Sequence, residues 1–200
     1  MKIEFIKTLK YESKPTNTDV FEYLSALTTQ SIDPPSISNT YIHTNAEVVF
    51  HSPLRRVVDT LEFKKDIKYI KTDRLSEILF DIKKLCSKEE WQKEKSDIVR
   101  KRFKEFFIKD QLPMKRSVIF NEIKSILKDC LSQSESFDIA VVSHSFRLKL
   151  IEAFISTEGK IVNNPVLIHK YILDDRKTYE FGTGFIIERK ELKKMKAKLK

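Results

Sequence analysis

The sequence predicts an α/β fold, a three-layer α/β/α sandwich with a mainly parallel central sheet. The first observation behind this prediction is that short β-branched or aromatic runs alternate with longer segments of helical periodicity, as in parallel strands joined by crossover helices. The second is the length of 200 residues, which suits one domain. The third is the composition of 40% hydrophobic and 34% charged residues, which is typical of a folded globular protein.

The first half of the chain is predicted to contain three short strands and two helices. Its helical segments place apolar residues on one face. Ser52 followed by Pro53 is a strong helix start, because serine caps a helix and proline fits its first position. The expected strands are 2–7, 46–50 and 67–70, and the expected helices are 18–29 and 53–63, with a Ser-, Pro- and Asn-rich loop over 30–45.

The second half is predicted to contain three helices and three strands. Residues 137–142 (FDIAVV) form the clearest buried strand of the protein. The helices are expected at 87–107, 116–131 and 146–156, and two further strands at 166–173 and 179–187, separated by a polar turn at 174–177.

The positive charge is concentrated at one end of the sequence. The chain carries +9, of which +6 lies in residues 189–200, so the other 188 residues carry only +3. We therefore expect a domain over 1–188 and a basic tail over 189–200, and we do not expect a dedicated nucleic-acid-binding domain. Leu192, Met195 and Leu199 have helical spacing, which favours a solvated, partly frayed terminal helix.

No segment has the features of a signal peptide or of the roughly 18 apolar residues that span a membrane. Cys86 and Cys130 lie far apart, without CxxC spacing or a histidine companion, which favours free thiols over a disulfide or a zinc site. The sequence thus predicts a cytoplasmic location and no metal site.

Two predicted strands end in polar residues suited to an anion. In open α/β sheets, ligands bind beyond the carboxyl ends of the strands. One strand is followed by His51, Ser52 and the basic pair Arg55 and Arg56, and another is followed by His144. A guanidinium and an imidazole that converge at helix starts indicate a phosphate site.

These segments, SPLRRVVDT, RLSEILF and VVSHSFRLKLI, resemble the motifs of the histidine phosphatase superfamily, the phosphoglycerate mutase-like proteins, in the family's order over about residues 46–156. The resemblance implies phosphoryl transfer through a phosphohistidine, with no metal or nucleotide cofactor. It also implies that Arg56 clamps phosphate, that Glu77 is the acid/base carboxyl, and that His144 is the second pocket histidine. The helix 87–107 would cap the pocket, and the other helices would pack on the sheet.

The family's first motif is missing. Its first strand ends in Arg-His-Gly, whereas this sequence has Ile6-Lys7-Thr8-Leu9. Lys7 keeps a positive charge and is expected to be an auxiliary phosphate ligand, but Thr8 stands where the nucleophilic histidine belongs. An unactivated threonine hydroxyl is a poor nucleophile near neutral pH. These departures point to a degenerate member of the family.

Each candidate also has a structural interpretation. Arg56 could pair on a helix surface with Asp59 or Asp73, His144 could be a capping or core histidine, and Glu77 a solvated carboxylate. Lys7 could be a strand-end surface lysine.

Three functions compete. The first is a domain that binds a phosphorylated small molecule or phosphoprotein through the relict pocket, without turnover. The second is an active phosphomonoesterase or phosphotransferase that uses His51 or His144 as its nucleophile. The third is a binding module for nucleic acid or an acidic partner through the basic tail. The sequence does not indicate an oligomeric state.

Overall fold

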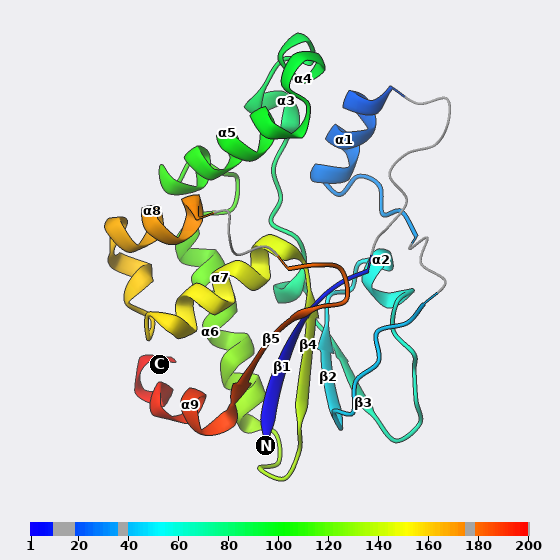
Figure 1. Cartoon of the computed structure of the whole chain (residues 1–200), viewed down its shortest axis with the longest axis vertical. Helices are drawn as coiled ribbons and strands as arrows, with labels where there is room; N and C mark the ends of the chain where they lie inside the picture. The colour runs from blue at the N-terminus through cyan, green and yellow to red at the C-terminus, as the bar shows by residue number, and fades with distance from the viewer. Residues whose placement is uncertain (10–18, 36–39, 175–178, 200) are drawn as a thin grey trace.

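The sheet has the mainly parallel order that the sequence predicts. A computed structural model describes residues 1–9, 19–35, 40–174 and 179–199. Within these residues the sheet has five strands in the order β3-β2-β4-β1-β5 (Figure 1). The pairs β1–β4, β2–β4 and β2–β3 are parallel, and β5 is antiparallel to β1. The strands are β1 (Lys2–Lys7), β2 (Val48–His51), β3 (Lys68–Lys71), β4 (Ile139–Ser143) and β5 (Gly184–Glu188).

Helices cover one face of the sheet and contain most of the core. The outward and inward alternation of strand residues sends Ile3 and Phe5 of β1 into this core and Ile6 to the opposite face. The helices that contribute to this core are drawn together on one side of the sheet in Figure 1. They are α5 (Ser96–Ile108), α6 (Arg116–Ser132), α7 (Ser145–Ser156), α8 (Pro165–Leu173) and α9 (Arg189–Lys194), with 3₁₀ turns at Asp73–Leu75, Lys160–Asn163 and Lys196–Leu199.

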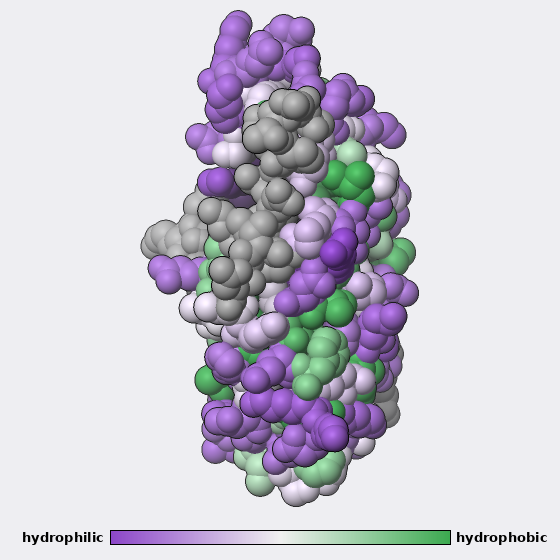
Figure 2. Space-filling view, turned by 90° about the vertical axis from the view of Figure 1, so that its right-hand side faces the viewer, coloured by the Kyte–Doolittle hydropathy of each residue, from purple (hydrophilic) through white to green (hydrophobic). Residues whose placement is uncertain are grey.

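The opposite face has a thinner layer. The helix α2 (Arg55–Val58) and the segments beside it place Val57, Leu61 and Ile42 over the sheet residues Val49 and Val142. Figure 2 views the side that carries α1, α2 and β3. Its described surface is mostly hydrophilic, with separate apolar areas. The three-layer architecture is therefore confirmed, with one layer of helices and one of a short helix and connecting segments.

A small group of helices lies beyond the carboxyl ends of the strands and forms a cap. It consists of α1 (Val20–Thr28), α3 (Ile82–Leu85), α4 (Lys88–Glu94) and the first half of α5. Phe21, Ile82, Cys86 and Ile98 form a separate apolar cluster there. The expectation that helix 18–29 packs on the sheet is therefore wrong. It packs on the cap because its apolar face meets α3 and α5.

The predicted strand 166–173 is wrong, since these residues form α8. Asn164 caps this helix by accepting hydrogen bonds from the amides of Val166 and Leu167, and Pro165 occupies its first position. The β-branched and aromatic residues favour a strand, but the cap and the proline determine the outcome. The polar turn predicted at 174–177 lies mostly outside the described residues.

Two predicted helices are shorter or divided. The helix expected over 53–63 is only α2, and Ser52 is not its N-cap, which is Leu54. The helix expected over 87–107 is split into α4 and α5 at Lys95, whose φ of 55° and ψ of −133° interrupt the helical path. Such a conformation is rare for a residue with a side chain.

The basic tail is not the solvated helix that the sequence favours. Leu192, Met195 and Leu199 are all buried, and they pack into the main core. Arg189 is also buried and donates hydrogen bonds to the carbonyl groups of Leu131 and Ser134 at the end of α6. The tail packs because its apolar spacing gives it a complete hydrophobic face.

Both cysteines are free thiols, as predicted, and both are buried. Among the described residues, the structure contains no helix of sufficient length and hydropathy to cross a membrane.

Candidate functional site

Three adjacent strand ends bring the candidate residues together. Thr8 follows β1, His144 follows β4 and Ser52 follows β2, and these strands are neighbours in the order β1–β4–β2. Backbone hydrogen bonds continue past the strands, from the Thr8 amide to Ser143 (2.9 Å) and from the Ser52 amide to Val142 (3.2 Å). The parallel register therefore places all three residues at one edge of the sheet, where ligands of such sheets bind.

Arg56 is at the centre of the site. Its side chain is only 2% exposed, and its guanidinium lies 3.4 Å from Oε2 of Glu77 and 3.6 Å from Oδ1 of Asp33. Burying a guanidinium is costly unless carboxylates compensate it. Asp59, one alternative partner, pairs with Arg55 on the helix surface. The surface interpretation of Arg56 is therefore wrong.

His144 and Arg56 share one carboxylate. Nδ1 of His144 lies 3.4 Å from Oε2 of Glu77, the same oxygen that faces Arg56. On its other side, Nε2 lies 3.1 Å from the hydroxyl oxygen of Ser52. Because a carboxylate can only accept, the proton belongs on Nδ1, and the Ser52 hydroxyl donates to Nε2.

The electrostatics of the site keep His144 neutral. Burial lowers the pKa of His144 to about 4, Glu77 opposes this shift, and Arg56 and Arg147 add to it. A neutral imidazole can accept a hydrogen bond at Nε2, which is the role that the Ser52 contact requires.

Ser52 and His51 are both buried. The hydroxyl of Ser52 accepts a hydrogen bond from the amide of Leu54 (3.3 Å). Nδ1 of His51 donates to the carbonyl oxygen of Ser52 (2.9 Å), and its ring packs edge-on against Phe63 and Tyr69. Burial lowers the pKa of His51, although its bond to Ser52 opposes this shift.

Lys7 lies at the rim and is held by a different segment. Its ammonium donates to the carbonyl oxygen of Tyr179 (2.8 Å) and lies 4.0 Å from the ring centroid of Phe181. Burial lowers the pKa of Lys7, and the negative charge of Glu77 opposes that effect. Lys7 is therefore within electrostatic reach of the site, although its ammonium is engaged outside it.

Two charge partners were not anticipated from the sequence, the exposed Asp33 and the buried Arg147. Asp33 lies in the predicted loop, where its carboxylate accepts from the first amide of α2, that of Arg55 (2.6 Å), and faces Arg56. Arg147, which is 1% exposed, bonds to the carbonyl of Ser76 (3.2 Å) and to Glu122 (2.8 Å). Asp33 thus places an internal anion where the helix start was expected to receive phosphate. Arg147 fixes the segment before Glu77.

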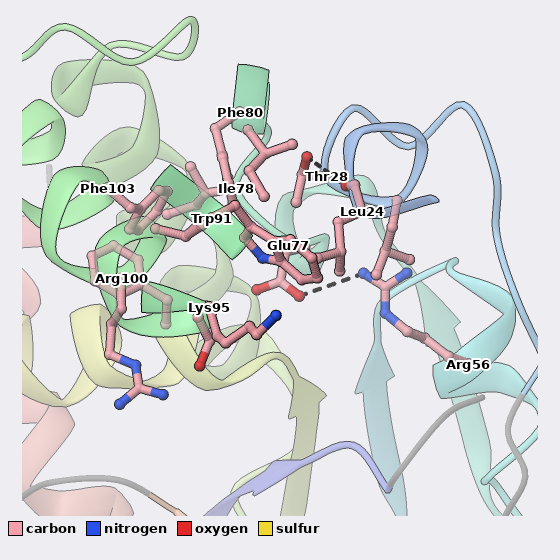
Figure 3. Close-up of a pocket in the computed structure, with 15 residues that line it drawn as sticks. Leu24, Thr28, Arg56, Glu77, Ile78, Phe80, Trp91, Lys95, Arg100 and Phe103 are labelled. Carbon is pink, nitrogen blue, oxygen red and sulfur yellow. Dashed lines mark hydrogen bonds and ion pairs between the residues drawn. The ribbon is translucent and has the colours of Figure 1, made fainter. Parts of the chain in front are cut away.

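A cavity of about 500 Å³ adjoins Arg56 and Glu77 (Figure 3). The cap provides most of its wall, so the predicted capping role of residues 87–107 is confirmed. Its lining includes Leu24, Ile78, Phe80, Trp91, Lys95 and Phe103. Among the described residues, no group of three or more His, Cys, Asp or Glu side chains could hold a metal ion.

Comparisons with known proteins agree with this architecture. Residues 37–159 match the histidine phosphatase superfamily (branch 1). The α-ribazole phosphatase of Shigella flexneri is similar over 91% of this chain and 87% of its own, with 13% identity and a TM-score of 0.52. A phosphoserine phosphatase mutant of Entamoeba histolytica has 19% identity and a TM-score of 0.45, covering 92% and 88%. A search of curated protein sequences finds no match.

The sheet order and the pocket at its carboxyl edge define a phosphoglycerate mutase-like α/β domain. The match over residues 37–159 spans more than half of the chain, and the protein belongs to the histidine phosphatase superfamily. The matched region begins after residues 6–9, the segment in which the first motif of the family is missing.

Proposed function

We propose that this protein binds a phosphate ester or a phosphorylated partner in the Arg56–Glu77–His144 pocket without forming a phosphohistidine. The observation that carries the proposal is that Arg56 and His144 face the same carboxylate oxygen of Glu77, while the residue after β1 is Thr8. Arg56 supplies the planar guanidinium that recognises phosphate oxygens. The proposal keeps His144, Ser52, His51 and Lys7 as further phosphate ligands, each of which must exchange its present partner for a phosphate oxygen.

The absence of turnover is inferred from how the possible nucleophiles are engaged. The hydroxyl of Thr8 donates to the carbonyl oxygen of Arg56 (2.9 Å), and the residue is 4% exposed. Nε2 of His144 accepts from Ser52, and its ring is 2% exposed. A hydroxyl nucleophile needs a base that removes its proton, and the Thr8 proton is directed at a carbonyl oxygen, which is not such a base. An imidazole nucleophile needs a free lone pair, and the lone pair on Nε2 of His144 accepts from Ser52.

The test measures phosphate binding and phosphate-ester hydrolysis, both with the full chain. Titration calorimetry with inorganic phosphate should detect binding, and a generic aryl phosphate should remain unhydrolysed over a broad pH range. Arg56→Met should weaken phosphate binding at least about tenfold, since a charge-assisted contact is lost, while Arg56→Lys should retain part of it.

Arg55→Met is the matched control, because Arg55 is the exposed neighbour of Arg56 and pairs on the surface with Asp59. It should bind phosphate as the unmodified protein does. Absence of phosphate binding, or robust hydrolysis that disappears in Arg56→Met, would overturn the proposal.

An active phosphomonoesterase is the competing function, with one observation in its favour. A pKa of about 4 keeps the imidazole of His144 unprotonated at neutral pH, the state that a nucleophile requires. If His144 reacts, an acid-labile phosphoprotein should be trapped with an active substrate and should be lost in His144→Ala. Failure to trap it eliminates this alternative.

A further inference from the structure

The cavity beside the phosphate pocket has a mainly apolar wall. It has a volume of about 500 Å³, within the usual range for small-molecule sites. Arg56 and Glu77 belong to its lining, so the cavity opens directly onto the proposed phosphate position. Figure 3 shows Glu77 near the middle of the lining, with Leu24 and Arg56 on one side of it and Trp91 and Phe103 on the other. The apolar residues of the lining include Leu24, Ile78, Phe80, Trp91, Phe103 and Phe146.

The charged groups of this cavity are mostly basic. Its lining contains three basic side chains, Arg56, Lys95 and Arg100, and one acidic side chain, Glu77. The ammonium of Lys95 lies 4.9 Å from the Trp91 ring, and Figure 3 shows the side chain on the Glu77 side of the cavity. Lys95 also has the strained backbone that divides α4 from α5, a feature that is concentrated at functional sites.

We infer that the ligand is a phosphate monoester of a bulky apolar alcohol or phenol, an inference that rests on the proposed function. The phosphate lies beside Arg56 and Lys95, and the hydrocarbon group occupies the cavity between α1 and α5. Apolar surface gains free energy when it leaves water. A sugar or glycerol group would exchange many of its hydrogen bonds with water for contact with a wall that is mostly apolar.

Three probes test this inference in the full chain: inorganic phosphate, methyl phosphate and n-hexyl phosphate. Calorimetry gives each dissociation constant, and fluorescence of Trp91, the single tryptophan of the chain, reports occupation of the cavity. The hexyl ester should bind at least about tenfold more tightly than the methyl ester, which two buried methylene groups would supply. Only the hexyl ester should change the Trp91 emission.

Leu24→Gln places a polar group in the cavity and should reduce the hexyl-to-methyl preference at least about threefold without changing methyl phosphate affinity. Val99→Thr, which keeps the side-chain shape, is the second variant and should act in the same direction. Val166→Gln is the matched control, since Val166 is 74% exposed on α8 and does not line the cavity.

The outcomes separate this inference from the proposed function. Equal affinities for the methyl and hexyl esters would overturn the apolar ligand class and leave phosphate binding intact. An undiminished hexyl preference in both Leu24→Gln and Val99→Thr would overturn the assignment to this cavity. If none of the three phosphates binds, the proposed function itself fails.

Discussion

The hydroxyl of Thr8 donates a hydrogen bond to the backbone carbonyl oxygen of Arg56, so the end of β1 is joined directly to α2. Thr8→Val keeps the shape of the side chain but removes the hydrogen bond to that buried carbonyl oxygen. The free energy of unfolding should fall by about 1–3 kcal/mol, as measured by urea denaturation. Thr8→Ser retains the hydroxyl and should remain closer to the unmodified protein. A stable Thr8→Val variant would show that this bond has no structural role.

Asp33 contacts Arg56 and the amide of Arg55, so under the proposed function it would compete with phosphate for both groups. Asp33→Asn preserves an oxygen that can accept from that amide but removes a negative charge from the site. Affinity for inorganic phosphate should therefore rise several-fold, since like charges at short range oppose anion binding. Titration calorimetry at neutral pH measures the change. The control Asp66→Asn alters an exposed carboxylate in the connection before β3 and should have no effect. Weaker binding by Asp33→Asn would assign Asp33 a positioning role instead.

His144 should make the stability of the fold depend on pH. Its pKa is about 4 in the folded protein, against 6.5 for an unperturbed histidine, so the unfolded chain binds the proton more readily. Stability is therefore lost as the pH falls from 6.5 to about 4, by about 3 kcal/mol in total. Urea denaturation across that range should show a shallower pH dependence for His144→Gln. His169→Gln changes an exposed histidine and should leave the dependence intact. Identical pH profiles for His144→Gln and the unmodified protein would contradict the burial of a neutral imidazole.

Because the tail is buried, its apolar residues should contribute to the stability of the fold, which a solvated tail would not do. Leu192 is 0% exposed and belongs to the main core, so Leu192→Ala should lower the free energy of unfolding by about 2–5 kcal/mol. Leu173→Ala is the control, because Leu173 is 42% exposed. If Leu192→Ala lowers the free energy of unfolding by less than about 0.5 kcal/mol, the tail is solvated, as the sequence favours.

This packing also changes how tail binding must be tested. Ending the chain at Glu188 would remove part of the core together with the charge, so lost binding would have two explanations. Substitution of exposed tail lysines by glutamine removes positive charge and leaves the buried residues of the tail in place. Among these lysines, Lys193 and Lys198 form ion pairs with Glu135 and Glu158, so their substitution also removes those pairs.

The sequence predicts the parts of the fold that depend on local pattern. The alternation of strands and helices identifies the sheet, and the runs around β1 and β4 are apolar enough to be unambiguous. The strand prediction at residues 166–173 is wrong, although Asn164 followed by Pro165 is a pattern typical of a helix N-terminus. It also misses the break at Lys95, because no residue type there requires a left-handed backbone.

In the candidate site, too, some residues are identified by local sequence pattern and others are not. Ser52, Arg56, Glu77 and His144 were identified by their motifs, and the structure joins them through short contacts. Asp33 and Arg147 could not be found in this way. Asp33 reaches Arg56 from a loop without a motif, and Arg147 differs from a surface arginine only through its burial beside Glu122. Tertiary packing, rather than local sequence, determines both positions.

The pairing of β1 has a consequence for the order in which the protein can be made. Ile3 pairs with Ile139 on one side and with Ile187 on the other, so the middle of the sheet joins distant parts of the chain. A nascent polypeptide must therefore leave Ile3 and Phe5 without their partners until the ribosome has produced most of the sequence. Such late closure slows folding and exposes this strand to aggregation until its partners are available.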